Sequence, residues 1–201
     1  MNKRNALKLI AASMGVAALG VGLAACSETK QSFNAVDITG ADYAKDFSLK
    51  DADGKVRTMA DFKGKAVVLF FGYAQCPDVC PTTMTEMAQV KQQLGKDGDK
   101  LQVLFVTVDP ARDTPEVLKA YMGAFDPTFV ALIPTLDELT ATAKDFKVYF
   151  KKVDGKTPTS YSMDHSAASF IYDPQGRLRL YARYGAGVPS MVSDLKALLG
   201  S

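Results

Sequence analysis

The sequence predicts an α/β fold with a mixed central β-sheet flanked by helices. Two near-continuous apolar runs, residues 66–71 and 101–108, have the composition of parallel strands buried on both faces. Helical patterns follow each of these runs. Near the C-terminus a polar turn at 173–176 separates two further strand-like segments, which is typical of an antiparallel hairpin. Parallel and antiparallel strands together make the predicted sheet mixed.

The first part of the domain is predicted as a β-hairpin that leads into the buried strand. Residues 46–50 and 55–58 alternate apolar and polar side chains around an Asp-Ala-Asp-Gly turn signal. A helix is predicted at 83–94. At helical spacing, methionines are more typical of a core than of a metal site. The apolar residues that recur on this helix are Met84, Met87, Val90 and Leu94.

The rest of the domain alternates between strands and helices. Thr114, followed by proline, marks one helix start, and Thr135 is the predicted N-cap of the next helix. Functional sites of open α/β sheets lie at the carboxyl ends of strands, so we expect the site just after residue 71. The predicted strands are 101–108, 129–133, 148–153, 167–172 and 177–184, and the predicted helices are 116–125, 136–146 and 189–199.

Length and charge exclude several classes of function. The 201 residues are enough for one domain with a full core. The formal charge is +2, of which Lys3, Arg4 and Lys8 contribute +3, so residues 26–201 carry −1. Such a surface gives no electrostatic reason to expect nucleic acid binding. Neither GxxxxGK[ST] nor GxGxxG occurs, so no phosphate-binding loop is predicted. We expect a monomer.

The N-terminus is predicted to be a signal peptide over residues 1–25. A positive segment precedes an apolar run, and small residues precede Cys26. This arrangement resembles the lipobox of bacterial lipoprotein signals, which implies cleavage before Cys26 and diacylglycerol on its sulfur. The alternative is an uncleaved membrane helix, because the uncharged run of 19 residues from 9 to 27 is just long enough to span. Its richness in alanine and glycine favours the lipoprotein.

Both interpretations place the domain outside the cytoplasm, on the periplasmic side of the membrane. In the favoured one, acyl chains on Cys26 anchor the protein to the membrane. Residues 26–42 are then predicted to be a flexible tether, and residues 43–201 the folded domain.

The candidate site begins with the sequence C-P-D-V-C-P after the first buried strand. Cys76 and Cys80 are four residues apart and can close on a soft metal ion or on each other. Pro81 is predicted at the first helical position, which places Cys80 near the N-cap, where the helix dipole stabilises a thiolate. The alternative is a structural disulfide or two inert core thiols. A disulfide closing so small a loop would stabilise little, which favours a functional pair.

The single histidine is the third candidate ligand. His165 follows a polar loop at 154–160 and is predicted to lie just before the strand 167–172. Imidazole suits copper and would complete a three-coordinate site with two thiolates. Asp164 is a candidate acceptor that would orient the ring. The alternative is an ordinary surface or core histidine.

Three motifs in this order resemble the Sco/SenC family: C-P-D-V-C-P-T-T at 76–83, V-D-P-A-R-D-T-P at 108–115 and D-H-S at 164–166. The resemblance covers about residues 46–199. It implies a thioredoxin-like fold and one copper ion, Cu(I) or Cu(II), per monomer. The implied copper ligands are Cys76, Cys80 and His165, with Asp78 inside the loop as a residue that tunes the thiols.

The same resemblance implies a client and a donor. The client is subunit II of cytochrome c oxidase, either receiving copper at its binuclear site or having the cysteines of that site reduced. A copper donor protein would load the chain. Two segments depart from the family pattern, residues 74–75 and 131–135. Neither segment includes a ligand, so the departures concern the surface that meets the client protein and do not affect the prediction of copper binding.

Metal carriage and thiol chemistry are the competing functions. The CxxxC spacing differs from the CxxC of thioredoxin-type dithiols. Thioredoxins also have a proline facing the dithiol, whereas His165 and Ser166 stand at that place here. A peroxiredoxin-like peroxidase would need neither the second cysteine nor the histidine. We therefore predict a metallochaperone and not an enzyme, with a thiol–disulfide oxidoreductase acting on client cysteines as the alternative.

Overall fold

The computed structural model describes residues 32–157 and 160–200. The predicted signal peptide and Cys26 lie outside the described residues. The strands are β1 (Val36–Asp37), β2 (Leu49–Lys50), β3 (Val56–Arg57), β4 (Ala66–Gly72), β5 (Leu101–Thr107), β6 (Val130–Leu132), β7 (Phe150–Asp154), β8 (Tyr161–His165), β9 (Ser169–Tyr172) and β10 (Leu178–Ala182). The helices are α1 (Val79–Gln93), α2 (Pro115–Gly123), α3 (Leu136–Phe146) and α4 (Val188–Leu199), with 3-10 turns at Met59–Phe62 and Gly95–Lys100.

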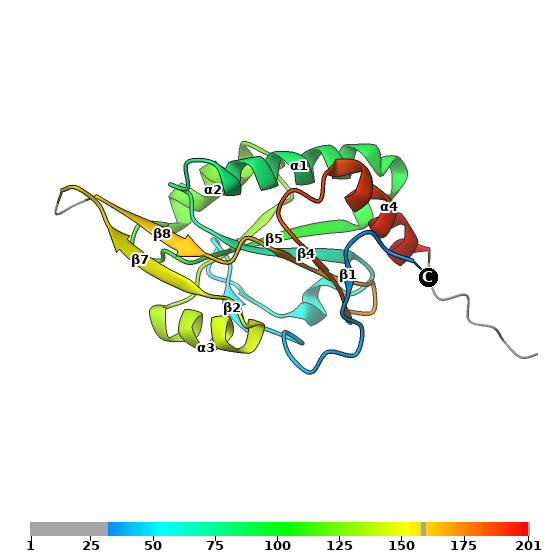
Figure 1. The fold of residues 1–201 in the computed structure, drawn as a ribbon, viewed down its shortest axis with the longest axis horizontal. Coiled ribbons are helices and arrows are strands. Elements are labelled where there is room, and N and C mark those ends of the chain that lie inside the picture. Colours follow the sequence, from blue (N-terminus) through cyan, green and yellow to red (C-terminus); the bar gives the residue numbers. More distant parts are fainter. Residues whose placement is uncertain (1–31, 158–159, 201) are drawn as a thin grey trace, which may run out of the picture. The chain divides into compact units, whose positions relative to one another are not determined.

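The central sheet is mixed, as predicted. Its strand order is β1-β10-β9-β4-β5-β6, with β4, β5 and β6 parallel and with β9 antiparallel to β4. Helices α1 and α4 lie on one face and α3 lies on the other (Figure 1). Every residue of β4 and β5 is buried, which explains why their sequences are almost continuously apolar. The predicted hairpins β2–β3 and β9–β10 are both present.

Two consecutive phenylalanines of β4 pack on opposite faces of the sheet. Phe71 packs edge-on against Phe146 of α3, with ring centroids 5.4 Å apart, and Phe70 packs against Phe105 at 6.2 Å. Successive side chains of a strand point to opposite faces. Phe70 is therefore on the face opposite to α3. Its ring lies 6.0 Å from that of His165, so the apolar core reaches the base of the candidate site.

The helix starts agree with the sequence in two places and differ in one. Thr114 and Thr135 accept hydrogen bonds from the first turns of α2 and α3, and Glu138 completes a capping box. The sequence predicts Pro81 at the first helical position. Helix α1 begins at Val79 instead, so Pro81 is its third residue. Proline is tolerated anywhere in the first turn of a helix, because the backbone N–H groups of that turn have no partner within the helix. Every helix in the described part of the chain is too short or too polar to span a membrane.

Methionines of α1 occupy the core. Met84 and Met87 are buried against the sheet, as their helical spacing predicts. The prediction that they are core residues and not metal ligands is consistent with this burial.

The predicted tether is wrong for its second half. Strand β1 pairs antiparallel with β10, with Val36 opposite Tyr181. Asp194 of α4 is buried and accepts the backbone N–H groups of Asn34 and Ala35, each at 2.8 Å. This segment is polar and its strand is two residues long. Its place in the domain therefore depends on contacts with residues about 160 positions away, which no local pattern reveals.

Replacing Asp194 with alanine is expected to lower the free energy of unfolding. Three donors, two on Asn34 and one on Ala35, would lose their charged acceptor, and a hydrogen bond to a charged group contributes about 1.5–3 kcal/mol. Urea unfolding of residues 27–201 measures the change. Removing residues 27–42 deletes the same bonds, so the substitution should cost much less in the shortened chain. Equal costs in both chains would show that Asp194 does not hold the N-terminal segment.

Candidate metal centre

The structure brings the three predicted ligands together. Cys76 lies in the loop after β4, Cys80 in the first turn of α1 and His165 at the end of β8. Their donor atoms all lie within 4.8 Å of one another. The Cys80 Sγ atom is 3.5 Å from His165 Nε2, although the two residues are 85 positions apart in the chain. No disulfide joins the cysteines. A soft-metal site of this donor set is thus preformed.

The cysteine loop is held by a buried carboxylate. Asp113 accepts the Thr107 hydroxyl at 2.6 Å and the backbone N–H of Ala74 at 3.1 Å. Burial raises the pKa of Asp113. At the end of β4, a Cβ atom on Gly72 would lie 2.7 Å from the Phe105 ring, so the close packing requires glycine. The loop therefore leaves the strand at a closely packed point.

The two thiols differ in environment. Cys80 is fully buried, and burial raises its pKa well above the ordinary value, with Cys76 adding to the effect. The prediction that the helix start stabilises a Cys80 thiolate is therefore wrong for the metal-free protein, because enclosing the side chain favours the neutral thiol. The helix-start N–H of Cys80 instead points to Cys76 Sγ at 3.4 Å. Cys76 is half-buried, so its sulfur is the more accessible of the two.

The histidine is oriented for metal binding. Its Nδ1 lies 3.0 Å from the Ser166 carbonyl oxygen. A carbonyl only accepts, so Nδ1 carries the hydrogen and Nε2 directs its lone pair towards Cys80. The rings of Phe70 and Tyr73 stand perpendicular to the imidazole at centroid distances of 6.0 and 5.9 Å. Burial lowers the pKa of His165, which keeps the ring neutral and available as a ligand.

The two predicted supporting carboxylates play smaller parts than expected. Asp164 is exposed, and as the neighbour of His165 in a strand it points to the opposite face. The hydrogen-bond acceptor for the ring is Ser166 and not Asp164, whose charge only opposes the larger effect of burial on the histidine pKa. Asp78 is exposed at the N-cap of α1, where it accepts the Thr82 hydroxyl at 3.4 Å. That Asp78 tunes the thiols stays a prediction.

Strand β8 was not predicted. His165 ends this strand, opposite Phe150 of β7, and does not merely precede the next strand. The strands β7 and β8 form a two-stranded ribbon that projects away from the central sheet (Figure 1). Residues 161–165 alternate, with Ser162 and Asp164 exposed between Tyr161, Met163 and His165, so a short strand pattern is present in the sequence. The functional residues missed in this region are Arg112 and Tyr161, whose contacts are described below.

The fold and the donor set define the class of protein. This is a thioredoxin-like domain that gathers two cysteines and a histidine at the carboxyl end of a central strand. Residues 36–200 match the family described as SCO1/SenC. The chain belongs to this family.

Known proteins of the family resemble the chain over most of the domain. Mitochondrial protein SCO2 of Saccharomyces cerevisiae is 41% identical over 133 residues, which cover 65% of this chain and 44% of the yeast protein. Among solved structures, Bradyrhizobium japonicum ScoI with copper bound is 38% identical, with a TM-score of 0.69 over 76% of this chain and 97% of that one. A SCO1/SenC family lipoprotein from Bacillus anthracis is 26% identical, with a TM-score of 0.65 over 76% and 92% of the two chains.

The curated relatives are longer than the matched region. The alignments span 44% of the yeast SCO2 protein, 65% of the SCO2-like protein of Rickettsia felis and 50% of the mitochondrial SCO2 homolog of Bos taurus. What the whole relatives do therefore comes to this chain only as a proposal.

Proposed function

We propose that the chain is a membrane-anchored, extracytoplasmic metallochaperone that carries one copper ion. The ligands are Cys76, Cys80 and His165, and the observation that carries the proposal is the convergence of their donor atoms within 4.8 Å. Thiolates select Cu(I), and the imidazole extends the site to Cu(II). The copper-bound ScoI of Bradyrhizobium japonicum, with the same fold, supports copper as the metal.

The unequal burial of the ligands suits a cargo site. Cys80 is inaccessible, whereas Cys76 and His165 are half-buried. A client can therefore replace the accessible ligands one at a time while Cys80 still holds the ion. In keeping with the family resemblance, the client in this proposal is the binuclear copper site of cytochrome c oxidase subunit II, and a separate donor protein supplies the ion.

Membrane attachment completes the proposal. A lipid on Cys26 would anchor the domain through residues 27–31, on the periplasmic side. The Bacillus anthracis relative, described as a lipoprotein, supports this arrangement.

A thiol–disulfide reductase is the second candidate function. One thiol is accessible and its partner is buried nearby, which is the arrangement of an attacking and a resolving cysteine. Cys76 thiolate would attack a client disulfide, and Cys80 would then displace the second client thiol, leaving the Cys76–Cys80 disulfide. Two electrons pass from this pair to the client. The CxxxC spacing differs from the CxxC of thioredoxin-type dithiols, and a histidine in contact with Cys80 stands where thioredoxins have a proline, so copper carriage is preferred.

Copper titration of reduced, metal-free residues 27–201 tests the proposal. We expect tight one-to-one binding of Cu(I) in competition with a Cu(I) chelator. Cys76→Ser or Cys80→Ser should abolish this tight binding, because each variant keeps only one of the two soft thiolate ligands beside the imidazole. Ser162→Ala serves as the matched control, since Ser162 is exposed on the face of β8 opposite to His165. Transfer to a copper-free subunit II domain is then followed by its absorption spectrum. Absence of tight copper binding, together with rapid reduction of a disulfide-bonded peptide, would replace the carrier by the reductase.

A further inference from the structure

We propose that Arg112 is a positioning residue that fixes His165 relative to the two cysteines. The inference rests on the proposed copper site and goes beyond it. Arg112 touches none of the three ligands. It acts by holding the β7–β8 ribbon, which carries the histidine, against the turn formed by residues 109–113. We call this segment the 109–113 turn.

Arg112 contacts the ribbon at the start of β8. Its Nη1 atom donates to the Tyr161 carbonyl oxygen at 3.0 Å, and its guanidinium carbon lies 3.5 Å from the centroid of the Tyr161 ring. Its Nε atom is ion-paired with Asp109, whose side chain is only 4% exposed. The tyrosine hydroxyl donates to the second oxygen of the same carboxylate at 2.9 Å. Arg112, Asp109 and Tyr161 thus form a closed network.

The ribbon needs such an anchor. Among the described strands, β7 and β8 pair only with each other, and an isolated two-stranded ribbon is marginally stable in water. Tyr161 and His165 are the first and last residues of β8 and lie on the same face. A clamp on Tyr161 therefore sets the position of the strand that ends in the histidine.

The same turn also holds the cysteine loop. Asp113 accepts the N–H of Ala74 at 3.1 Å, and its own N–H donates to the Asp109 carbonyl at 3.0 Å. The guanidinium carbon of Arg112 is 5.8 Å from the ring centroid of Tyr73, which in turn packs edge-on against His165. The 109–113 turn therefore contacts both parts of the metal site and fixes the distance between them.

Loosening the clamp should affect the two oxidation states differently. The cysteine loop is bonded at Ala74 by Asp113 and not by Arg112, and two thiolates can hold Cu(I). Cu(II) in this site requires the imidazole. Arg112→Gln is thus expected to lower Cu(II) affinity about 10-fold or more, the usual effect of removing a group that orients a ligand. It should also weaken the histidine-dependent features of the Cu(II) spectrum while leaving Cu(I) affinity unchanged.

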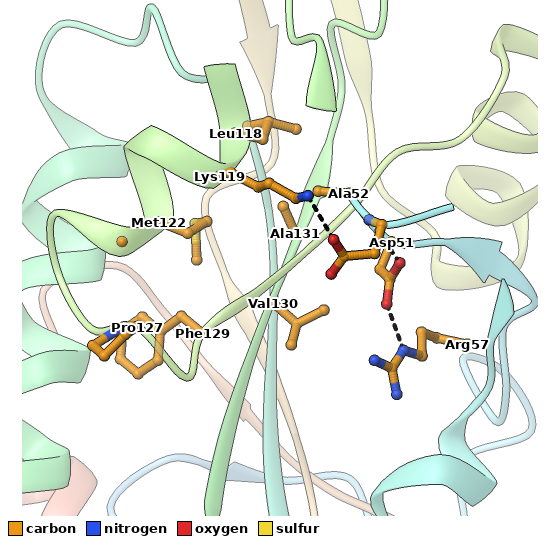
Figure 2. A pocket seen from close by; sticks show the side chains of 12 residues that line it. Asp51, Ala52, Arg57, Leu118, Lys119, Met122, Pro127, Phe129, Val130 and Ala131 are labelled. Carbon is orange, nitrogen blue, oxygen red and sulfur yellow. Dashed lines mark hydrogen bonds and ion pairs between the residues drawn. The ribbon is translucent and has the colours of Figure 1, made fainter. Parts of the chain in front are cut away.

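Arg57→Gln is the matched control. Arg57 is paired with Asp51, also 4% exposed, on the β2–β3 hairpin (Figure 2). Both substitutions remove an arginine from a buried carboxylate, so both should lower stability. Only Arg112→Gln should change the ratio of Cu(II) to Cu(I) affinity.

Two further variants separate charge from geometry. Arg112→Lys keeps a cation for Asp109 but lacks the planar fork that also reaches the Tyr161 carbonyl. We expect it to recover stability and to remain defective for Cu(II). Tyr161→Phe removes only the hydroxyl bond to Asp109, and it gives a milder loss in the same direction should Arg112→Gln fail to fold.

Two results would count against this inference, and they differ from failure of the carrier proposal. A Cu(II) spectrum and affinity ratio that are the same in the Arg112 and Arg57 variants would overturn it. So would full Cu(II) binding by Arg112→Lys and Tyr161→Phe. Failure of the carrier proposal looks different: the wild-type chain itself would then bind no copper, whatever the Arg112 variants do.

Discussion

Oxidation of Cys76 and Cys80 to a disulfide is expected to abolish high-affinity copper binding. Only thiolates are strong ligands for Cu(I), and a disulfide leaves His165 as the one remaining strong donor. The two sulfurs lie within 4.8 Å of each other, so a small movement of the half-buried Cys76 is enough to join them. Cu(I) titration of the oxidised chain in competition with a chelator measures the loss, which we expect to be complete at any concentration where the reduced chain is saturated.

Restoring copper binding by reducing the disulfide is the control for this experiment. Treatment with a thiol reductant, followed by its removal under anaerobic conditions, should restore one-to-one binding. All titrations are compared at one pH, because burial raises the pKa of Cys80 and its proton must leave when the metal binds. Apparent affinity therefore falls as the pH is lowered, independently of oxidation. Undiminished binding by fully oxidised protein would remove both cysteines from the site.

The parts of the fold that follow from local chemistry could be predicted. Strands β4 and β5 are apolar because both faces are covered, and helix α3 begins at Thr135 because the capping box is local. The three ligands could be predicted because both cysteines stand in one short motif and the resemblance to the Sco/SenC family adds the single histidine. Long-range pairing was not predictable: β1 is two residues long, and only its pairing with the distant strand β10 makes it a strand.

Burial was the second property that local patterns did not reveal. The helix start at Cys80 predicts a stabilised thiolate, but the sequence does not show that this side chain is completely enclosed. Arg112 illustrates the same limit. Its motif was visible in sequence as a family marker, yet its contact with Tyr161, 49 positions away, exists only after the ribbon has folded back.

The imidazole should matter far more for Cu(II) than for Cu(I). We expect His165→Ala to lower Cu(II) affinity by more than about 100-fold, since losing a ligand exceeds the 10–100-fold cost of losing a group that merely orients one. Cu(I) affinity should change little, because the two thiolates remain. Parallel titrations with the two ions measure both affinities, and the thiolate-to-Cu(II) absorption band should shift in the variant.

A neighbouring carboxylate provides the control for this substitution. Asp164→Ala changes the adjacent residue of β8, which is exposed and points away from the site, so it should leave both affinities unaltered. Equal and negligible effects of His165→Ala on both ions would return the histidine to an ordinary packing role. A selective loss of Cu(II) has a further consequence for delivery. Cys76 and Cys80 alone could then carry Cu(I), so the histidine would decide which oxidation state stays bound until the client arrives.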